Sequence, residues 1–187
     1  MPRQVLTRHP DTTCTAIERV EAELGADEHG ALRLCYRMIG DTRLVVAAPL
    51  ARGARPQRRD ELWRHTCCEL FVHDAAGDGY REYNFAPCSD WAAYRFTGYR
   101  TGRTPLEMPA PRIVLERKPM VLALTVTLSD QPLDALRTLR VGIACVVETP
   151  AGSSYWALAH PPGRPDFHHA RGFALAPVLE HTADCLG

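Results

Sequence analysis

Aromatic and carboxylate side chains that could recognise a small molecule occur in two parts of the sequence. Trp63 comes shortly before an apolar stretch that contains Glu69, and Trp156 lies beside Tyr155 ahead of a loop rich in Pro and Gly. Indole rings pack against the apolar C–H faces of sugars, and polar neighbours bind the hydroxyl groups. We therefore hypothesise that Trp63 and Trp156 face one ligand. The alternative is that both rings are packed in the core, since Trp is mostly buried.

Glu69 needs a partner because it lies within an apolar run, where an unpaired charge is costly. Arg81 and Asn84, on the next strand-like stretch, and Arg95, on the one after it, are candidates. The carboxylate could form a structural ion pair or could bind ligand hydroxyl groups, and both possibilities stay open. The candidate ligand-binding residues are Trp63, Glu69, Arg81, Asn84 and Trp156.

A second group of side chains could hold a metal or haem. His160, Asp166, His168 and His169 follow one another closely in the sequence. Imidazole and carboxylate groups ligate zinc and similar metals, and haem takes an axial His. However, adjacent histidines on a strand point to opposite faces, and no HExxH spacing is present. A divalent metal on His160, Asp166 and His168, or haem on one of the histidines, is therefore an alternative to a site without a cofactor, in which His160 and Asp166 hold the loop by hydrogen bonds.

Acid–base chemistry is a further alternative, with Glu69 paired to His65 or His160. Such a pair would need a buried pocket and strongly shifted pKa values. The sequence has no GxSxG turn and no glycine-rich phosphate loop. Cys67 and Cys68 are poor nucleophile candidates, because Glu69 disfavours the neighbouring thiolate. We therefore expect a module that binds a ligand without transforming it.

The elements that position these residues are predicted to be strands. Apolar and polar residues alternate over 31–39 and again over 121–128, as expected when one face of a strand is buried. Gly, Pro and Asp supply turns between such runs. The predicted strands are residues 17–24, 31–39, 43–48, 67–73, 80–85, 91–96, 112–117, 121–128, 139–147, 154–159 and 172–179.

Strand-like runs that recur about every ten residues, without a long helical pattern, predict an all-β fold. We expect an antiparallel β-sandwich of the immunoglobulin-like or jelly-roll type, with about 10–11 strands and one or two short helical turns. Residues 132–138 are the best helical candidate, and residues 1–13 are expected to be an extended arm or strand. A chain of 187 residues, 45% of them hydrophobic, fits one domain that spans residues 1–187.

The overall composition bears on partners and location. Lys and Arg total 22 and Asp and Glu total 22, so there is no basic excess of the kind that nucleic-acid binders show. The local basic run over 52–59 is expected to be a solvated loop. No run is apolar enough for a membrane span, and residues 1–14 lack the apolar core of a secretory signal. Seven cysteines without a CxxC pair favour reduced thiols and a cytoplasmic location.

Two segments resemble a known family. Residues 60–96 contain a Trp ahead of a strand, an acidic residue within it, a Gly/Asp turn, and Tyr and Asn on the return strand: Trp63, Glu69, Tyr80 and Asn84. This pattern resembles DOMON-like domains related to family 9 carbohydrate-binding modules. Residues 153–173 are similar to the end of bacterial DOMON-like proteins of undefined function.

The resemblance implies a β-sandwich that binds a sugar or haem at one face or edge. Where the sugar-binding members have a more acidic start to the strand, this chain has His65, Thr66, Cys67 and Cys68. We expect a carbohydrate or a similar polyhydroxylated small molecule as the ligand. An interaction domain that binds a partner through a sheet edge is the remaining alternative.

Overall fold

The computed structural model describes residues 2–48, 55–73, 77–132 and 139–174. These residues form eleven strands, all paired antiparallel. Three short 3-10 turns accompany them: η1 (Thr42–Leu44), η2 (Leu62–Arg64) and η4 (Ala170–Gly172). The strands are β1 (Gln4–Arg8), β2 (Ile17–Ala26), β3 (Ala31–Gly40), β4 (Cys67–His73), β5 (Tyr80–Phe85), β6 (Trp91–Phe96), β7 (Thr104–Pro105), β8 (Arg112–Lys118), β9 (Val121–Pro132), β10 (Arg140–Thr149) and β11 (Gly152–Ala157).

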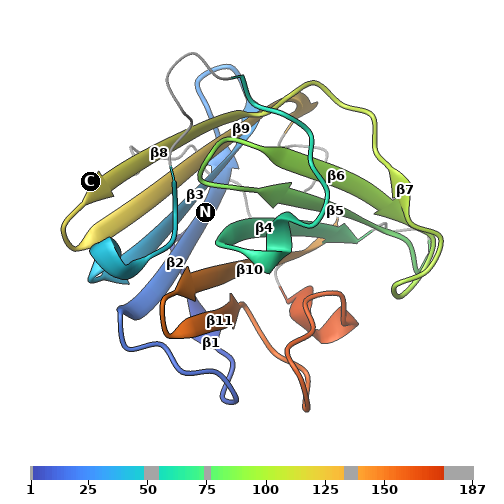
Figure 1. The fold of residues 1–187 in the computed structure, drawn as a ribbon. Coiled ribbons are helices and arrows are strands. Elements are labelled where there is room, and N and C mark those ends of the chain that lie inside the picture. Colours follow the sequence, from blue (N-terminus) through green and yellow to red (C-terminus); the bar gives the residue numbers. More distant parts are fainter. Residues whose placement is uncertain (1, 49–54, 74–76, 133–138, 175–187) are drawn as a thin grey trace.

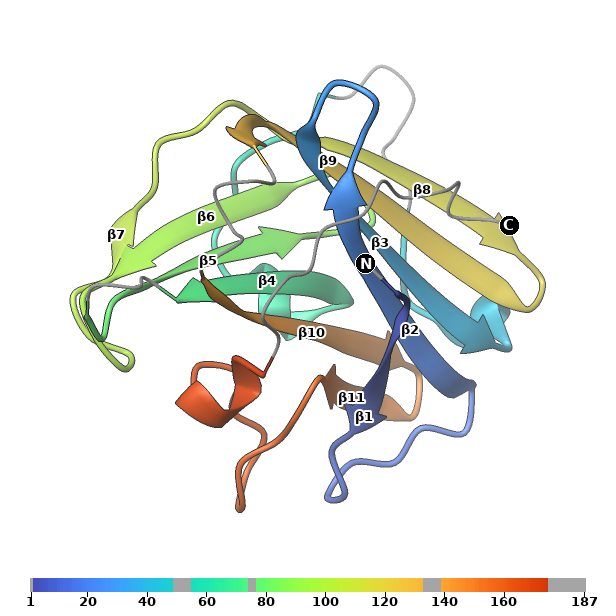
Figure 2. The same cartoon turned by 180° about the vertical axis from the view of Figure 1, so that it is seen from behind.

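One curled sheet contains all eleven strands, in the order β7-β6-β5-β4-β10-β11-β1-β2-β3-β9-β8 (Figures 1 and 2). Strand β1 joins the two flanks of this sheet. Its first residues, from Gln4 to Leu6, pair with β2, and its last two, Thr7 and Arg8, pair with β11. Because β1 belongs to both flanks, the sheet can fold back on itself and enclose one core.

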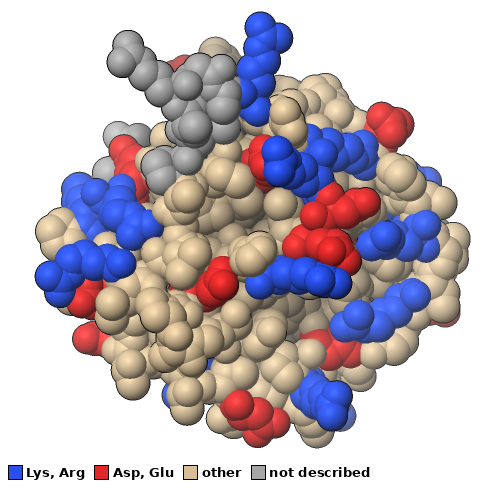
Figure 3. Space-filling model, viewed as in Figure 1, with Lys and Arg blue, Asp and Glu red and all other residues tan. Residues whose placement is uncertain are grey.

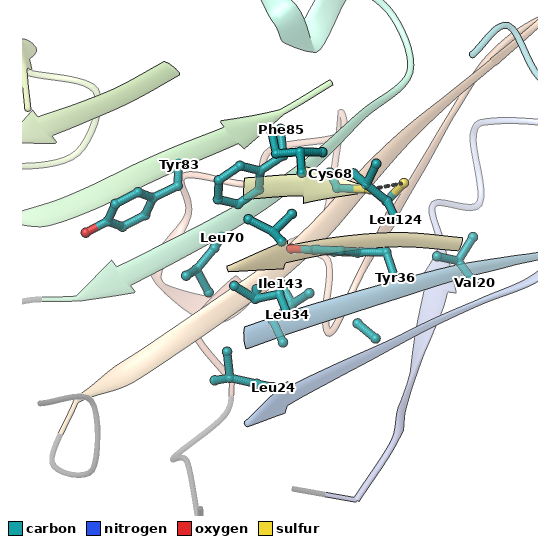
Figure 4. Packing of buried hydrophobic residues seen from close by; sticks show 14 of the residues in the cluster. Val20, Leu24, Leu34, Tyr36, Cys68, Leu70, Tyr83, Phe85, Leu124 and Ile143 are labelled. Carbon is teal, nitrogen blue, oxygen red and sulfur yellow. Dashed lines mark hydrogen bonds between the residues drawn. The ribbon is translucent and has the colours of Figure 1, made fainter. Parts of the chain in front are cut away.

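Side chains of both flanks meet in this core. On β3 and β9 every second residue is buried, as the alternation in the sequence predicts. Figure 4 shows Tyr36 of β3 among Leu70 of β4 and Ile143 of β10. The Tyr36 hydroxyl donates a hydrogen bond to the Glu69 carbonyl oxygen at 2.8 Å, which satisfies the polar end of a fully buried ring. We call the face of each strand that points into this core the inner face.

The expected all-β, antiparallel architecture is confirmed. The immunoglobulin-like or jelly-roll type is not, because β1 joins the flanks into one sheet. The expected strand at 43–48 is wrong: turn η1 begins there, and Arg117 donates hydrogen bonds to the carbonyl oxygens of Thr42, Val45 and Ala47 in place of a strand ladder. Of the expected strand at 172–179, residues up to 174 form the end of η4 and a loop, and the rest lies outside the described residues, as does the helical candidate after Pro132.

Five of the cysteines are free thiols: Cys14, Cys67, Cys68, Cys88 and Cys145. Cys35 is disulfide-bonded, so the expectation of reduced thiols is wrong at that position. Within the described parts of the chain, no helix has the length and apolar character needed to cross a bilayer.

The outer face of β4, β5, β6, β10 and β11 is covered by a second, smaller apolar cluster. Phe71, Tyr80 and Phe96 belong to it, and Phe173 packs on them from the segment that follows β11. Turn η2 contributes Leu62 and Trp63 to the same cluster. In Figure 3 positive and negative side chains are interleaved over the visible face rather than separated by sign. The outer face is thus covered by two segments far apart in the sequence, turn η2 and the segment after β11. The space between them forms the candidate site.

Candidate functional site

A cavity of about 650 Å³ opens on the outer face, between η2, the loop after β6 and the segment after β11. Its aromatic walls are Trp63 from η2, Tyr155 from β11 and Phe167 from the segment after β11. All three rings are half-buried, so each presents part of its surface to the cavity. A half-exposed ring beside a cavity is the arrangement in which an apolar sugar face can be bound.

Two carboxyl groups lie at the floor of the cavity, Glu69 from β4 and Glu82 from β5. Strand register explains why both point outward. On β4 the residues on either side of Glu69, Cys68 and Leu70, pack in the core, so Glu69 takes the outer face. Glu82 pairs with Phe71, which belongs to the outer cluster, and therefore shares that face.

The Glu69 carboxyl group lacks part of its hydrogen bonding. It is 3% exposed, and among the described residues its Oε1 atom has no hydrogen-bond partner. Burial raises the pKa of Glu69 well above its usual value, and the nearby Glu82 raises it further. Both effects favour the protonated carboxyl, which can donate a hydrogen bond as well as accept one. An unsatisfied buried polar atom in a cavity wall is a contact point for a polar ligand group.

Glu82 is better satisfied than Glu69. The Asn84 side-chain amide donates a hydrogen bond to its Oε1 atom at 2.6 Å. Burial raises the pKa of Glu82, although that hydrogen bond opposes the shift. His168 Nε2 lies 3.9 Å from Glu82 Oε2, and burial lowers the pKa of His168 to about 4. His168 is therefore neutral near pH 7, and the floor of the cavity carries less charge than its residue types suggest.

A set of hydrogen bonds ties the loop after β6 to the segment after β11. Asp166 accepts hydrogen bonds from the Tyr99 hydroxyl at 2.6 Å and from Arg100 Nη2 at 2.9 Å. The Tyr80 hydroxyl accepts the Arg100 backbone N–H at 3.2 Å and lies 2.8 Å from His168 Nδ1. Burial would raise the pKa of Asp166, but the bonds from Tyr99 and Arg100 outweigh it and lower that pKa. We call Tyr99, Arg100 and Asp166 the clasp.

Replacement of Asp166 by Ala is expected to lower the free energy of unfolding by about 1–3 kcal/mol, because it removes charge-assisted hydrogen bonds from a mostly buried carboxylate. Amide hydrogen exchange over residues 97–103 should become faster, since the loop loses its tie. The matched control is Glu107→Ala, which removes a fully exposed carboxylate paired with Arg58 and should change little. Equal effects of the two substitutions in chemical denaturation would contradict a structural role for the clasp.

The predicted ligand-binding residues separate into two groups. Trp63 and Glu69 line the cavity, and Asn84, fully buried behind it, positions Glu82. Arg81 and Trp156 do not line this cavity, because both belong to the inner face. Arg81 pairs with Val72, a core residue, and its Nη1 atom lies 3.3 Å from Gln131 Oε1 of β9.

Trp156 is 4% exposed and packs in the core, where its Nε1 donates a hydrogen bond to Ser154 Oγ at 2.9 Å. Its neighbour Tyr155 takes the outer face and lines the cavity in its place. The predicted Trp63–Trp156 pair around one ligand is therefore wrong. The structure replaces it with Trp63, Tyr155 and Phe167.

The predicted metal ligands do not converge. His160 Nε2 lies 2.8 Å from the Thr7 carbonyl oxygen, His168 is held by Tyr80, and Asp166 belongs to the clasp. His169 Nδ1 instead accepts the Arg171 N–H and caps η4. In the ranges that the structure describes, no group of three or more His, Cys, Asp or Glu side chains is arranged to hold a metal ion.

The predicted acid–base pair is also not formed. His65 Nδ1 lies 2.9 Å from Glu148 Oε2 at an exposed position, and His160 is bound to β1. The histidine that shares the cavity with Glu69 is His168, which the sequence suggested as a metal or haem ligand. Glu82 was missed, although it lies two residues from both Tyr80 and Asn84 on a predicted strand and so had to share their face.

The comparisons with known proteins support the fold. No family model matches the chain, and no curated protein sequence matches it. A putative carbohydrate-binding protein from Bacteroides uniformis has a similar structure, with a TM-score of 0.60 and 14% identity over 92% of this chain and 84% of that protein. A family 9 carbohydrate-binding module from Caldicellulosiruptor kristjanssonii, solved with cellotriose, has a TM-score of 0.50 and 12% identity over 86% of this chain and 74% of that module. At these identities the likeness establishes the fold alone, which is similar to that of the family 9 module.

Proposed function

We propose that the chain is a non-catalytic binding module and that the outer-face cavity holds a saccharide. The observation that carries the proposal is the Glu69 carboxyl group, whose buried Oε1 atom lacks a partner among the described residues in a cavity walled by half-exposed rings. A sugar supplies both complements, hydroxyl groups for the carboxyl and C–H faces for Trp63 and Tyr155. The similar family 9 module was solved with a bound cellotriose, which supports the same ligand class here.

We also propose that the chain is a DOMON-like domain. The support is that the residues of the resemblance gather around one place. Trp63 and Glu69 line the cavity, Tyr80 belongs to the outer cluster beside it, and Asn84 binds Glu82 at its floor. A pattern read along the sequence thus corresponds to one neighbourhood in space.

Replacement of Trp63 by Ala is expected to weaken saccharide binding by about ten- to a hundredfold, since stacking on an aromatic ring contributes about 1–3 kcal/mol. Isothermal titration with cellotriose and other oligosaccharides measures the effect. The control is Met120→Ala, an exposed apolar truncation in the β8–β9 turn on the other flank, which should leave affinity unchanged.

Replacement of Glu69 by Gln separates polar recognition from stacking. Gln keeps the shape and both hydrogen-bonding roles, so affinity should fall less than in Glu69→Ala. Binding of every oligosaccharide with equal affinity by the wild type and by Trp63→Ala would contradict the proposed site. The absence of any saccharide binding by the wild type would contradict the proposed function itself.

A further inference from the structure

The cavity mouth carries arginines whose charges are not all neutralised by the protein. Arg64 is paired with Glu61 at 2.9 Å, and Arg100 is paired with Asp166 in the clasp. Arg103 also lines the cavity, and its guanidinium lies 4.8 Å from the centre of the Tyr94 ring. Among the residues that the structure describes, no carboxylate lies within ion-pair distance of Arg103. This cation is therefore available to a ligand.

A second, shallower groove of about 710 Å³ continues from the cavity. Arg100 and Pro165 line both spaces, so a bound chain could pass from one to the other. The groove adds Arg164 and Arg171 to its lining, and neither forms an ion pair within the described ranges. The acid that lines it, Asp166, is already engaged by Tyr99 and Arg100. Cavity and groove together thus place Arg103, Arg164 and Arg171 along one path.

The cations lie outside the carboxyl groups of the cavity. Glu69 and Glu82 are 3% and 4% exposed, whereas Arg103, Arg164 and Arg171 are exposed. Burial raises the pKa of both carboxyl groups, although Arg103 and Arg100 lower that of Glu82. Buried carboxyl groups at the floor and exposed guanidinium groups at the rim fit a ligand whose uncharged ring enters the cavity and whose anionic group stays outside. Guanidinium groups bind carboxylates through two parallel hydrogen bonds and are less heavily hydrated than ammonium groups, so they suit this role.

We propose that the bound saccharide is acidic: a uronic-acid oligosaccharide with one ring against Trp63 and a carboxylate against Arg103, extending over the groove toward Arg164 and Arg171. This proposal rests on the proposed function, because it assigns the chemical class of the ligand at the same site. It adds that the groove is a continuation of the binding site and that the arginine charges favour an anionic ligand over a neutral one.

The test compares trigalacturonic acid with its fully methyl-esterified form, which has the same rings and length but no charge. The acid is expected to bind on the order of tenfold more tightly than the ester, and raising the salt concentration should reduce only the affinity for the acid. Arg103→Gln should lower the affinity for the acid more than that for the ester, so that the acid-to-ester ratio falls toward one. Arg164→Gln combined with Arg171→Gln should act in the same direction.

Arg43→Gln is the matched control, because it makes the same charge change at an exposed position on turn η1. Equal affinity for acid and ester, or an equal loss for both in Arg103→Gln, would overturn the acidic ligand while leaving saccharide binding in place. Tighter binding of a sulfated oligosaccharide than of the uronate would contradict the proposal that the recognised anionic group is a carboxylate. Failure of both acid and ester to bind while cellotriose binds would overturn the acidic ligand alone, whereas failure of all three to bind would overturn the proposed function as well. Trp63→Ala should weaken the binding of acid and ester alike, because both place a ring against the indole.

Discussion

Replacement of Trp156 by Ala is expected to lower the free energy of unfolding by about 3–5 kcal/mol, the usual cost of removing a large aromatic side chain from a core. The indole is 4% exposed and lies opposite Cys145 on β10, within the cluster that joins the two flanks of the sheet. Truncation leaves a cavity that the surrounding strands can close only in part. Urea denaturation, with the slope of the transition compared between variants, measures the loss.

The matched substitution is Trp63→Ala, the same truncation at a half-buried position on the outer face. It should cost clearly less stability but should weaken saccharide binding, whereas the folded fraction of Trp156→Ala should bind as the wild type does. This outcome would show that Trp156 serves stability and that Trp63 serves ligand binding. The reverse pattern, with stability lost at Trp63 and affinity lost at Trp156, would show that the assignment of faces is wrong.

The strands could be predicted because burial leaves a period of two in the sequence. Runs such as 31–39 and 121–128 carry this signal over their whole length, and the structure places strands β3 and β9 there. The pattern does not indicate whether the outer face of a strand is also covered, by loops or turns from elsewhere in the chain. Strand β11 shows the difficulty, since Tyr155 and Trp156 are adjacent and both faces of the strand are packed. A choice that is wrong by one residue moves a side chain from the cavity to the core.

The charged rim could not be predicted for a different reason. Arg100 and Arg103 lie in the loop after β6, and their positions depend on the bond between Tyr99 and Asp166, which are 67 residues apart in the sequence. No local spacing encodes such a contact. The same holds for His168, whose place in the cavity depends on Tyr80, 88 residues earlier. The local pattern therefore indicated Trp63, just ahead of a strand, and Glu69, within that strand, but not the residues that the loops contribute.

The free energy of unfolding is expected to fall by about 3 kcal/mol between pH 6.5 and pH 4 on account of His168. Burial lowers the pKa of His168 to about 4, with Arg100 as a second cause, whereas the unfolded chain keeps the usual value of 6.5. Between these two values the unfolded state binds a proton that the folded state does not, so stability is lost as the pH falls. Well above pH 6.5 the ring is neutral in both states, and its contribution no longer depends on pH.

A difference measurement isolates this effect, because the pKa of Glu69 is shifted in the opposite sense. The stability of the wild type minus that of His168→Gln should decline as the pH is lowered from 7 to 4. The wild type minus Glu69→Gln should instead decline as the pH is raised, since a carboxyl with a raised pKa holds its proton more tightly in the folded state. A flat difference for His168→Gln would show that the imidazole is protonated as freely in the folded protein as in the unfolded chain. In that case the imidazole would carry a charge into the cavity in which the saccharide ring is proposed to bind.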